Sequence, residues 1–177
     1  VPAIAQDPVM GVDMKPDMVS FATLTPYALL GLCFGPVAGV LASKFGYRSV
    51  LRAGLIVSIA GVLFGIFLSN NASIPSLVII SVVLGIAYAG TANIMLNGLG
   101  IVLSPEDNPG YLPGMNAGAF NLGAGLSFAV LYAVMDAFAM NGAQVGYSAA
   151  MIASAVLLGA ALLVSLFIPK PSDADNS

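Results

Sequence analysis

The sequence contains no histidine, a single cysteine and very few charged residues. Lysine and arginine number 5 and aspartate and glutamate 8, so charged residues make up only 7% of the chain, whereas a typical soluble domain has about 25%. A soluble protein of 177 residues needs more polar groups than this to cover its surface. The shortage of charge excludes an ordinary soluble domain. It also excludes an intrinsically disordered chain, which requires many charges and few apolar residues.

The missing side chains exclude several kinds of chemistry as well. Without histidine, the chain lacks the commonest general base and the commonest ligand of transition metals. The single cysteine, Cys33, cannot form an internal disulfide. The sequence has no nucleophile motif and no phosphate-binding loop, and no basic patch indicates nucleic acid as a partner. We therefore predict that the protein is not an enzyme and that it binds no cofactor and no metal.

Long apolar runs take the place of the charges. Hydrophobic residues make up 59% of the chain and the mean hydropathy is +0.98. A helix needs about 20 mostly apolar residues to cross the hydrocarbon core of a bilayer. Five runs are long enough, at residues 19–43, 50–68, 76–103, 113–140 and 147–168. The sequence therefore predicts an all-α membrane protein, with a bundle of about five transmembrane helices between residues 19 and 168.

The few positive charges predict how this bundle is oriented. Lys44, Arg48 and Arg52 lie at the connector between the first two predicted helices, and Lys170 follows the fifth. Five crossings place this connector and the C-terminal end on one side of the membrane, and the side rich in lysine and arginine is cytoplasmic. We expect a multi-pass protein of the cell membrane, with an extracytoplasmic segment at 1–18 and a polar cytoplasmic tail at 169–177.

Glycines at helical spacing mark the first predicted helix. Gly31, Gly35 and Gly39 fall four residues apart, on one face. Small residues allow helix backbones to approach closely in lipid, so the pattern predicts tight packing. An alternative is a hinge at the Gly35–Pro36 pair, because Pro36 removes a backbone hydrogen bond.

The third predicted helix has small and polar residues at every fourth position, namely Ser81, Gly85, Ala89, Asn93 and Asn97. Tyr88 lies nearby, and the fourth predicted helix offers Asn116, Asn121 and Ser127. Buried amides in lipid need partners, so these faces must meet another helix or a wet cavity. One interpretation is hydrogen bonding between helices. The other is a solute cavity, for which the candidate substrate-binding residues are Asn93, Asn97, Asn116, Asn121 and Tyr88.

Asp136 is the one acidic residue inside the five predicted helices, and it lies near the outer end of the fourth. An acid within a membrane span is a candidate proton or cation site. The alternative is a helix-end carboxylate that is solvated by interfacial water.

Residues 39–51 resemble the loop signature of the major facilitator superfamily, roughly Gly-x-Leu-Ala-Asp-Arg-x-Gly-Arg-Arg-x-x-Leu. The matching positions are Gly39, Leu41, Ala42, Gly46, Arg48 and Leu51, and Lys44 keeps the charge of its position. Ser43 and Tyr47 depart from the signature, since they replace its aspartate and the first of its paired arginines. This degenerate form is similar to the second copy of the signature, which lies between helices eight and nine.

Other segments resemble the C-terminal half of this family. The run from Pro113 to Gly125 is similar to helix eleven of its multidrug proton antiporters, and Pro169 suits the end of helix twelve. The resemblance covers nearly the whole chain and implies five of the six helices in the C-terminal half of a major facilitator fold. The missing N-terminal half would belong to a longer protein or come from a partner chain, or a second copy would take its place.

The resemblance also implies a function. A chain of this kind would be the C-terminal part of a secondary active transporter that works by alternating access, here proton-coupled efflux of small hydrophobic or drug-like solutes. The loop residues Gly39, Ser43, Lys44, Gly46 and Arg48 would form a cytoplasmic gate. One incomplete half cannot enclose a solute, so we expect no transport by the isolated chain. The alternative is a small helical membrane subunit or interaction protein that moves no solute.

Overall fold

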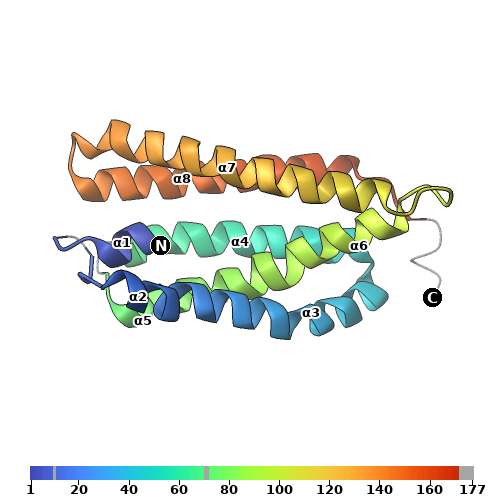
Figure 1. Ribbon diagram of the computed structural model, residues 1–177, viewed down its shortest axis with the longest axis horizontal. Coiled ribbons are helices and arrows are strands. Elements are labelled where there is room, and N and C mark those ends of the chain that lie inside the picture. Colours follow the sequence, from blue (N-terminus) through green and yellow to red (C-terminus); the bar gives the residue numbers. More distant parts are fainter. Residues whose placement is uncertain (10, 70–71, 172–177) are drawn as a thin grey trace.

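The computed structural model describes residues 1–9, 11–69 and 72–171. Within these residues the chain is helical and has no strand. Three parts of the predicted organisation lie outside the described residues, namely residue 10 in the N-terminal segment, 70–71 in the second connector and 172–177 in the tail. Figure 1 shows the helices as long rods lying side by side.

Five helical stretches among the described residues are long and apolar enough to cross a membrane, as predicted. The first span is built from α2 (Pro16–Val19), η1 (Ser20–Leu24) and α3 (Thr25–Phe45), and the second is α4 (Tyr47–Ser69). The third is built from α5 (Ile74–Leu84), η2 (Gly85–Asn93) and α6 (Ile94–Val102). The fourth is α7 (Tyr111–Ala139), and the fifth is α8 (Ala143–Val164), which continues into η3 (Ser165–Phe167). A short helix, α1 (Pro2–Gln6), precedes them.

The five spans form two groups (Figure 1). The first three spans pack together, with η2 lying against both α3 and α4. The last two spans, α7 and α8, pack along each other, and α8 also packs against α4. Figure 1 shows the α3–α4 turn, the α6–α7 loop and the end of α8 at one end of the bundle, which we call the Gly46 end. The α7–α8 turn lies at the opposite end, the Gly142 end.

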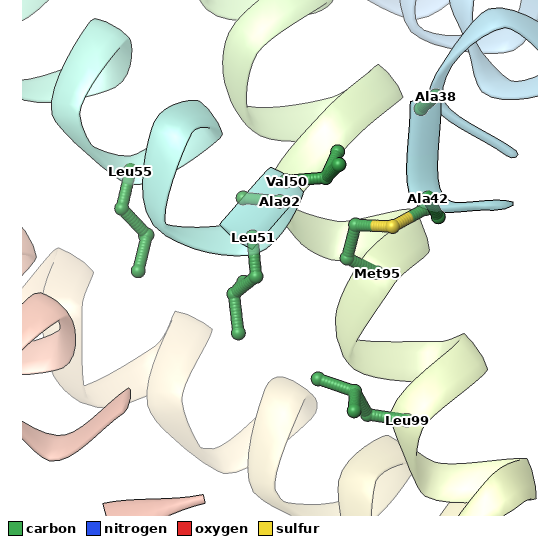
Figure 2. Packing of buried hydrophobic residues seen from close by; sticks show 8 residues of the cluster. All are labelled: Ala38, Ala42, Val50, Leu51, Leu55, Ala92, Met95 and Leu99. Atoms are coloured by element: carbon green, nitrogen blue, oxygen red, sulfur yellow. The ribbon is translucent and has the colours of Figure 1, made fainter. Parts of the chain in front are cut away.

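The main buried cluster holds the first three spans together (Figure 2). It consists of Ala38, Ala42, Val50, Leu51, Leu55, Ala92, Met95 and Leu99. Its small alanines come from α3 and η2, where they leave room for the larger side chains of α4 and α6. By contrast, α7 buries none of its 29 residues. The fourth span is therefore the least enclosed of the five.

Glycines allow the backbones of the first three spans to approach closely. A Cβ added at Gly31 would lie 2.7 Å from the Cβ of Ala89, and one added at Gly85 would lie 2.6 Å from the carbonyl oxygen of Tyr27. Contacts this short leave no space for a side chain. The packing interpretation is confirmed at Gly31, whereas Gly39 has no atom within 4 Å of an added Cβ.

Two spans contain π-helical turns that the residue pattern does not predict. The turn η1 comes just before Pro26, which has no N–H to donate to the carbonyl one turn earlier. A π-helical turn is one way in which a membrane helix satisfies the carbonyls near a proline, and the N–H of Thr25 donates to the carbonyl of Ser20. Pro36 lies inside α3, which remains a single helix from Thr25 to Phe45.

Candidate functional site

Two of the predicted polar residues meet where α6 contacts α7. The Nδ2 of Asn116 donates a hydrogen bond of 2.8 Å to the Oδ1 of Asn97. The Nδ2 of Asn97 in turn donates to the carbonyl oxygen of Asn93, at 3.0 Å. Asn97 lies five residues before the end of α6 and Asn116 five residues after the start of α7, so the pair is roughly 8 Å from the Gly46 end of these helices. The interpretation of these residues as a link between helices is confirmed for this pair.

A second link joins the same two helices at this end. The backbone N–H of Leu112 donates to the Oγ of Ser104, at 3.2 Å, and this hydroxyl donates to the carbonyl oxygen of Gly100, at 2.8 Å. Side chains thus link α6 and α7 at the Gly46 end. Toward the Gly142 end, α7 packs mainly on α8.

The other two asparagines are placed differently. Asn121 is exposed and donates to the carbonyl oxygen of Ala117 in its own helix, at 2.9 Å. It points about 140° away from Asn116 around α7, because an α-helix turns about 100° per residue. Asn93 is half-buried, and its side-chain amide has no hydrogen-bond partner among the described residues. The structure therefore brings Asn97 and Asn116 together, but not Asn121.

A cavity of about 600 Å³ lies between the α7–α8 pair and the first three spans, a volume typical of small-molecule sites. Of the predicted site residues, Tyr88 lines it, and so does Ser127. Four further polar residues of the lining were not predicted, namely Tyr27, Ser58, Ser154 and Ser165. Isolated hydroxyl groups in apolar helices form no repeating pattern from which a site could be predicted. Tyr27 directly follows Pro26, and this proline is a feature of the sequence that could have pointed to it.

The predicted gate residues surround a very short turn. Only Gly46 separates α3 from α4, so both helices extend further than predicted. Gly46 has φ 81° and ψ 147°, a backbone conformation that favours glycine, and its N–H donates to the carbonyl oxygen of Ala42, at 2.8 Å. Ser43 donates to the carbonyl oxygen of Val40, at 2.8 Å, and Lys44 is exposed in the last turn of α3.

Two residues dock this turn onto neighbouring helices. The ring of Tyr47, which replaces an arginine of the family signature, packs so closely on Gly98 of α6 that an added Cβ there would lie 2.5 Å from a ring carbon. The Nη2 of Arg52 donates to the carbonyl oxygen of Ser165, at 3.2 Å, and a cation is favourable at such a helix C-terminus. The Nε atoms of Arg48 and Arg52 are buried, without a hydrogen-bond partner among the described residues.

The acidic residues of the spans lie near the Gly142 end. Asp136 is exposed, three residues before the end of α7, and Asp17 falls in the first turn of α2 because the first span begins earlier than predicted. At the same end, the Tyr147 hydroxyl donates to the Oδ2 of Asp7, at 2.7 Å. In the described part of the chain, no three His, Cys, Asp or Glu side chains could hold a metal ion together.

Comparison with known proteins connects this geometry to a family. The sequence profile of the Major Facilitator Superfamily matches residues 2–177. The chain is 51% identical over 175 residues to the uridine/deoxyuridine transporter of Lactococcus lactis subsp. cremoris (strain MG1363). The aligned part is 98% of this chain but 36% of that relative, so the chain spans about a third of the relative's length. No solved structure matches the chain.

Proposed function

The chain belongs to the major facilitator superfamily, and we propose that it forms the C-terminal part of a secondary transporter for nucleosides of the uridine type. Membership of this family points to a membrane transporter rather than an enzyme, and the five apolar spans agree with a multi-pass membrane protein. We infer the substrate class from the 51% identity, over 98% of this chain, to a uridine/deoxyuridine transporter.

The polar groups of the candidate site suit an uncharged polar solute. A nucleoside has no ionised group at neutral pH, and it offers a planar base and sugar hydroxyls. The hydroxyls that line the cavity, and the candidate asparagines of the third and fourth spans, are likewise neutral donors and acceptors. Binding sites of this kind combine an apolar wall with a few polar groups that fix the orientation of the ligand.

Efflux of drug-like solutes, which the sequence pattern favours, has no counterpart in the relative, whose name describes a nucleoside transporter. Proton coupling remains part of the proposal, with Asp136 as its candidate site. Its position near a helix end also suits a carboxylate that is merely solvated. Transport under an imposed pH gradient, with Asp136→Asn as the variant, separates these two roles.

We further propose that the Gly46 end faces the cytoplasm and forms the gate. Four of the five lysines and arginines of the chain belong to this end, in agreement with the charge bias of cytoplasmic loops. The open surface of α7 would face the part of the transporter that this chain does not contain. In this account the gate residues Lys44 and Arg48 contact that part when the cytoplasmic side closes.

The test of this function is growth on uridine. A bacterial host that can neither make pyrimidines nor take up uridine is given the full-length gene that encodes this chain. We expect growth on micromolar uridine with the gene and none with the empty vector. If the cells do not grow but gain resistance to unrelated hydrophobic drugs, the nucleoside proposal is wrong and drug efflux is favoured. If the gene begins at this chain and gives neither result, the alternative of a membrane subunit is favoured.

A further inference from the structure

We propose that Tyr88 and Asn93 form a pair that recognises the uracil ring, in which Tyr88 stacks on the ring and Asn93 binds its N3–O4 edge. This inference rests on the proposed function, because it names the groups by which the same site would select its substrate. It also goes beyond that function, because neither the relative's name nor the loop signature assigns a role to these two residues.

The winding of η2 brings the two residues to one side of the helix. In an ordinary α-helix, residues five apart point about 140° away from each other. The segment from Gly85 to Asn93 is π-helical, a form in which bonds join residues five apart. The hydroxyl of Thr91 donates to the carbonyl oxygen of Ile86, five residues earlier, at 2.8 Å. A π-helix has about 4.4 residues per turn, so Tyr88 and Asn93, with the same separation, point within about 50° of each other around η2.

Contacts at both ends of this pair show which neighbour it faces. Asn97, one turn beyond Asn93, is hydrogen-bonded to Asn116 of α7. Tyr88 lines the 600 Å³ cavity together with Ser127, also of α7. Asn93 does not line the cavity itself but lies between these two contacts along the third span, so the side that carries the pair looks toward α7.

Two other sides of η2 pack closely against α3 and α4. A Cβ added at Gly90 would lie 2.9 Å from the carbonyl oxygen of Gly31 in α3. A Cβ added at Gly54 of α4 would lie 2.8 Å from the carbonyl oxygen of Ala87 and 3.0 Å from the backbone nitrogen of Ala92. At these contacts only backbone atoms fit. A second cavity, of about 420 Å³, borders η2 at Ile86, Ala87 and Thr91, but its lining is mostly apolar. The side that carries Tyr88 and Asn93 is therefore the one that suits a polar solute.

The uracil ring matches what this side offers. An asparagine side chain has a carbonyl oxygen that accepts and an NH2 group that donates, so it can pair with N3–H and O4 of uracil at once, as asparagine does with other base edges. An aromatic side chain supplies a stacking surface for the ring. Uridine and deoxyuridine differ only at the 2′ position, so the base is a part that both share. An amide at membrane depth without a partner is unfavourable, and a bound base would supply one.

Two uridine analogues test the hydrogen-bonding contact and the stacking contact separately. In 3-methyluridine the N3–H is replaced by a methyl group, and in 5,6-dihydrouridine the ring is neither aromatic nor flat. Binding of each analogue relative to uridine is measured by competition with labelled uridine on the purified full-length transporter, so a variant with no transport activity still gives a result. The variants are Asn93→Ala, Asn93→Leu, Tyr88→Leu and Tyr88→Phe. Asn141→Ala serves as a matched control in the exposed α7–α8 turn.

We expect the unmodified transporter to bind 3-methyluridine at least about tenfold more weakly than uridine, as the loss of a two-bond contact predicts. Asn93→Ala should bring the two affinities to within about threefold of each other, mainly by weakening the binding of uridine. Tyr88→Leu should remove the preference for uridine over 5,6-dihydrouridine, whereas Tyr88→Phe should keep it. Asn141→Ala should change neither ratio.

The outcomes are distinguishable. If the unmodified transporter does not bind uridine, the proposed function itself fails. If it binds uridine but the Asn93 variants keep the original 3-methyluridine ratio, the inference is overturned, and Asn93 pairs with another helix instead. If Asn93→Ala does not give a monodisperse protein, the nearly isosteric Asn93→Leu variant gives the same ratio to compare.

Discussion

Asn116 donates a hydrogen bond of 2.8 Å to Asn97, and this bond joins α7 to α6 near the Gly46 end of the bundle. Because α7 buries none of its residues, the bond is one of few polar attachments between the fourth span and the first three. Hydrogen bonds between membrane helices are worth about 0.6 kcal/mol on average and up to about 1.7 kcal/mol. The link therefore positions α7 without fixing it rigidly.

Breaking this link should reduce stability by a small, measurable amount. We expect Asn116→Leu and Asn97→Leu each to lower the free energy of unfolding by about 1 kcal/mol, and the double variant to be little worse than either one. Thermal unfolding in detergent provides the measurement. Asn121→Leu is the control, because Asn121 bonds only to its own helix. Fully additive losses would show that the two side chains are not coupled.

A methyl group at Gly85 should be strongly destabilising. The added Cβ would lie 2.6 Å from the carbonyl oxygen of Tyr27, so α3 and η2 would have to separate. Overpacking of this kind costs about 1–3 kcal/mol, and we expect Gly85→Ala to lower the melting temperature accordingly.

The matched control for this substitution is Gly159→Ala in α8. An added Cβ at Gly159 has no atom within 4 Å, so the substitution gains the helix propensity of alanine without a clash. It should leave the melting temperature unchanged or raise it. Equal effects of the two substitutions would show that α3 and η2 do not pack through Gly85.

The α3–α4 turn should depend on Gly46 for a different reason. Its φ of 81° lies in the left-handed region, where a side chain is strained by about 1–2 kcal/mol. We expect Gly46→Ala to destabilise the protein by that amount, and Gly39→Ala, which has open space and an ordinary helical backbone, to have little effect. Chemical denaturation in mixed micelles compares the two, and a harmless Gly46→Ala substitution would contradict the geometry of the turn.

The number of spans was predictable because it depends only on length and apolar composition, which a bilayer constrains strongly. The start of the third span could also be predicted from the sequence. Pro75 suits a first helical turn and is found there, behind a capping box formed by Ser73 and Ser76. The predicted helix ends were less accurate at the α3–α4 turn. Six residues were expected to connect the two helices, but a single glycine with positive φ reverses the chain there.

The arrangement of the polar residues was not predictable in full, because it depends on how each helix is wound. Residues spaced by four, such as Gly85, Ala89 and Asn93, drift in one direction around an α-helix and in the opposite direction around η2, which is π-helical over these positions. Gly85 and Ala89 contact α3 instead. Conversely, Tyr88 and Asn93 gain a common side that no α-helical pattern indicates. The close backbone contacts that accompany this winding join residues distant in sequence, so a local pattern does not contain them.

The orientation in the membrane can be tested directly. Single cysteines are introduced at Asn108, in the α6–α7 loop, and at Asn141, in the α7–α8 turn, both in a Cys33→Ser background. The distribution of lysine and arginine predicts that a membrane-impermeant thiol reagent added to intact cells labels Asn141→Cys and not Asn108→Cys. Labelling of Asn108→Cys alone would reverse the orientation, and labelling of neither would contradict the positions of these loops.

The most direct test of the account is substrate exchange, because exchange needs no knowledge of the coupling ion. Proteoliposomes containing the full-length transporter are loaded with unlabelled deoxyuridine and diluted into a trace of labelled uridine. We predict a transient accumulation of label that excess uridine abolishes, and no accumulation with the 177-residue chain alone. If the full-length protein gives no accumulation, or if the isolated chain exchanges uridine unaided, the assignment of this chain as one part of a nucleoside transporter is wrong.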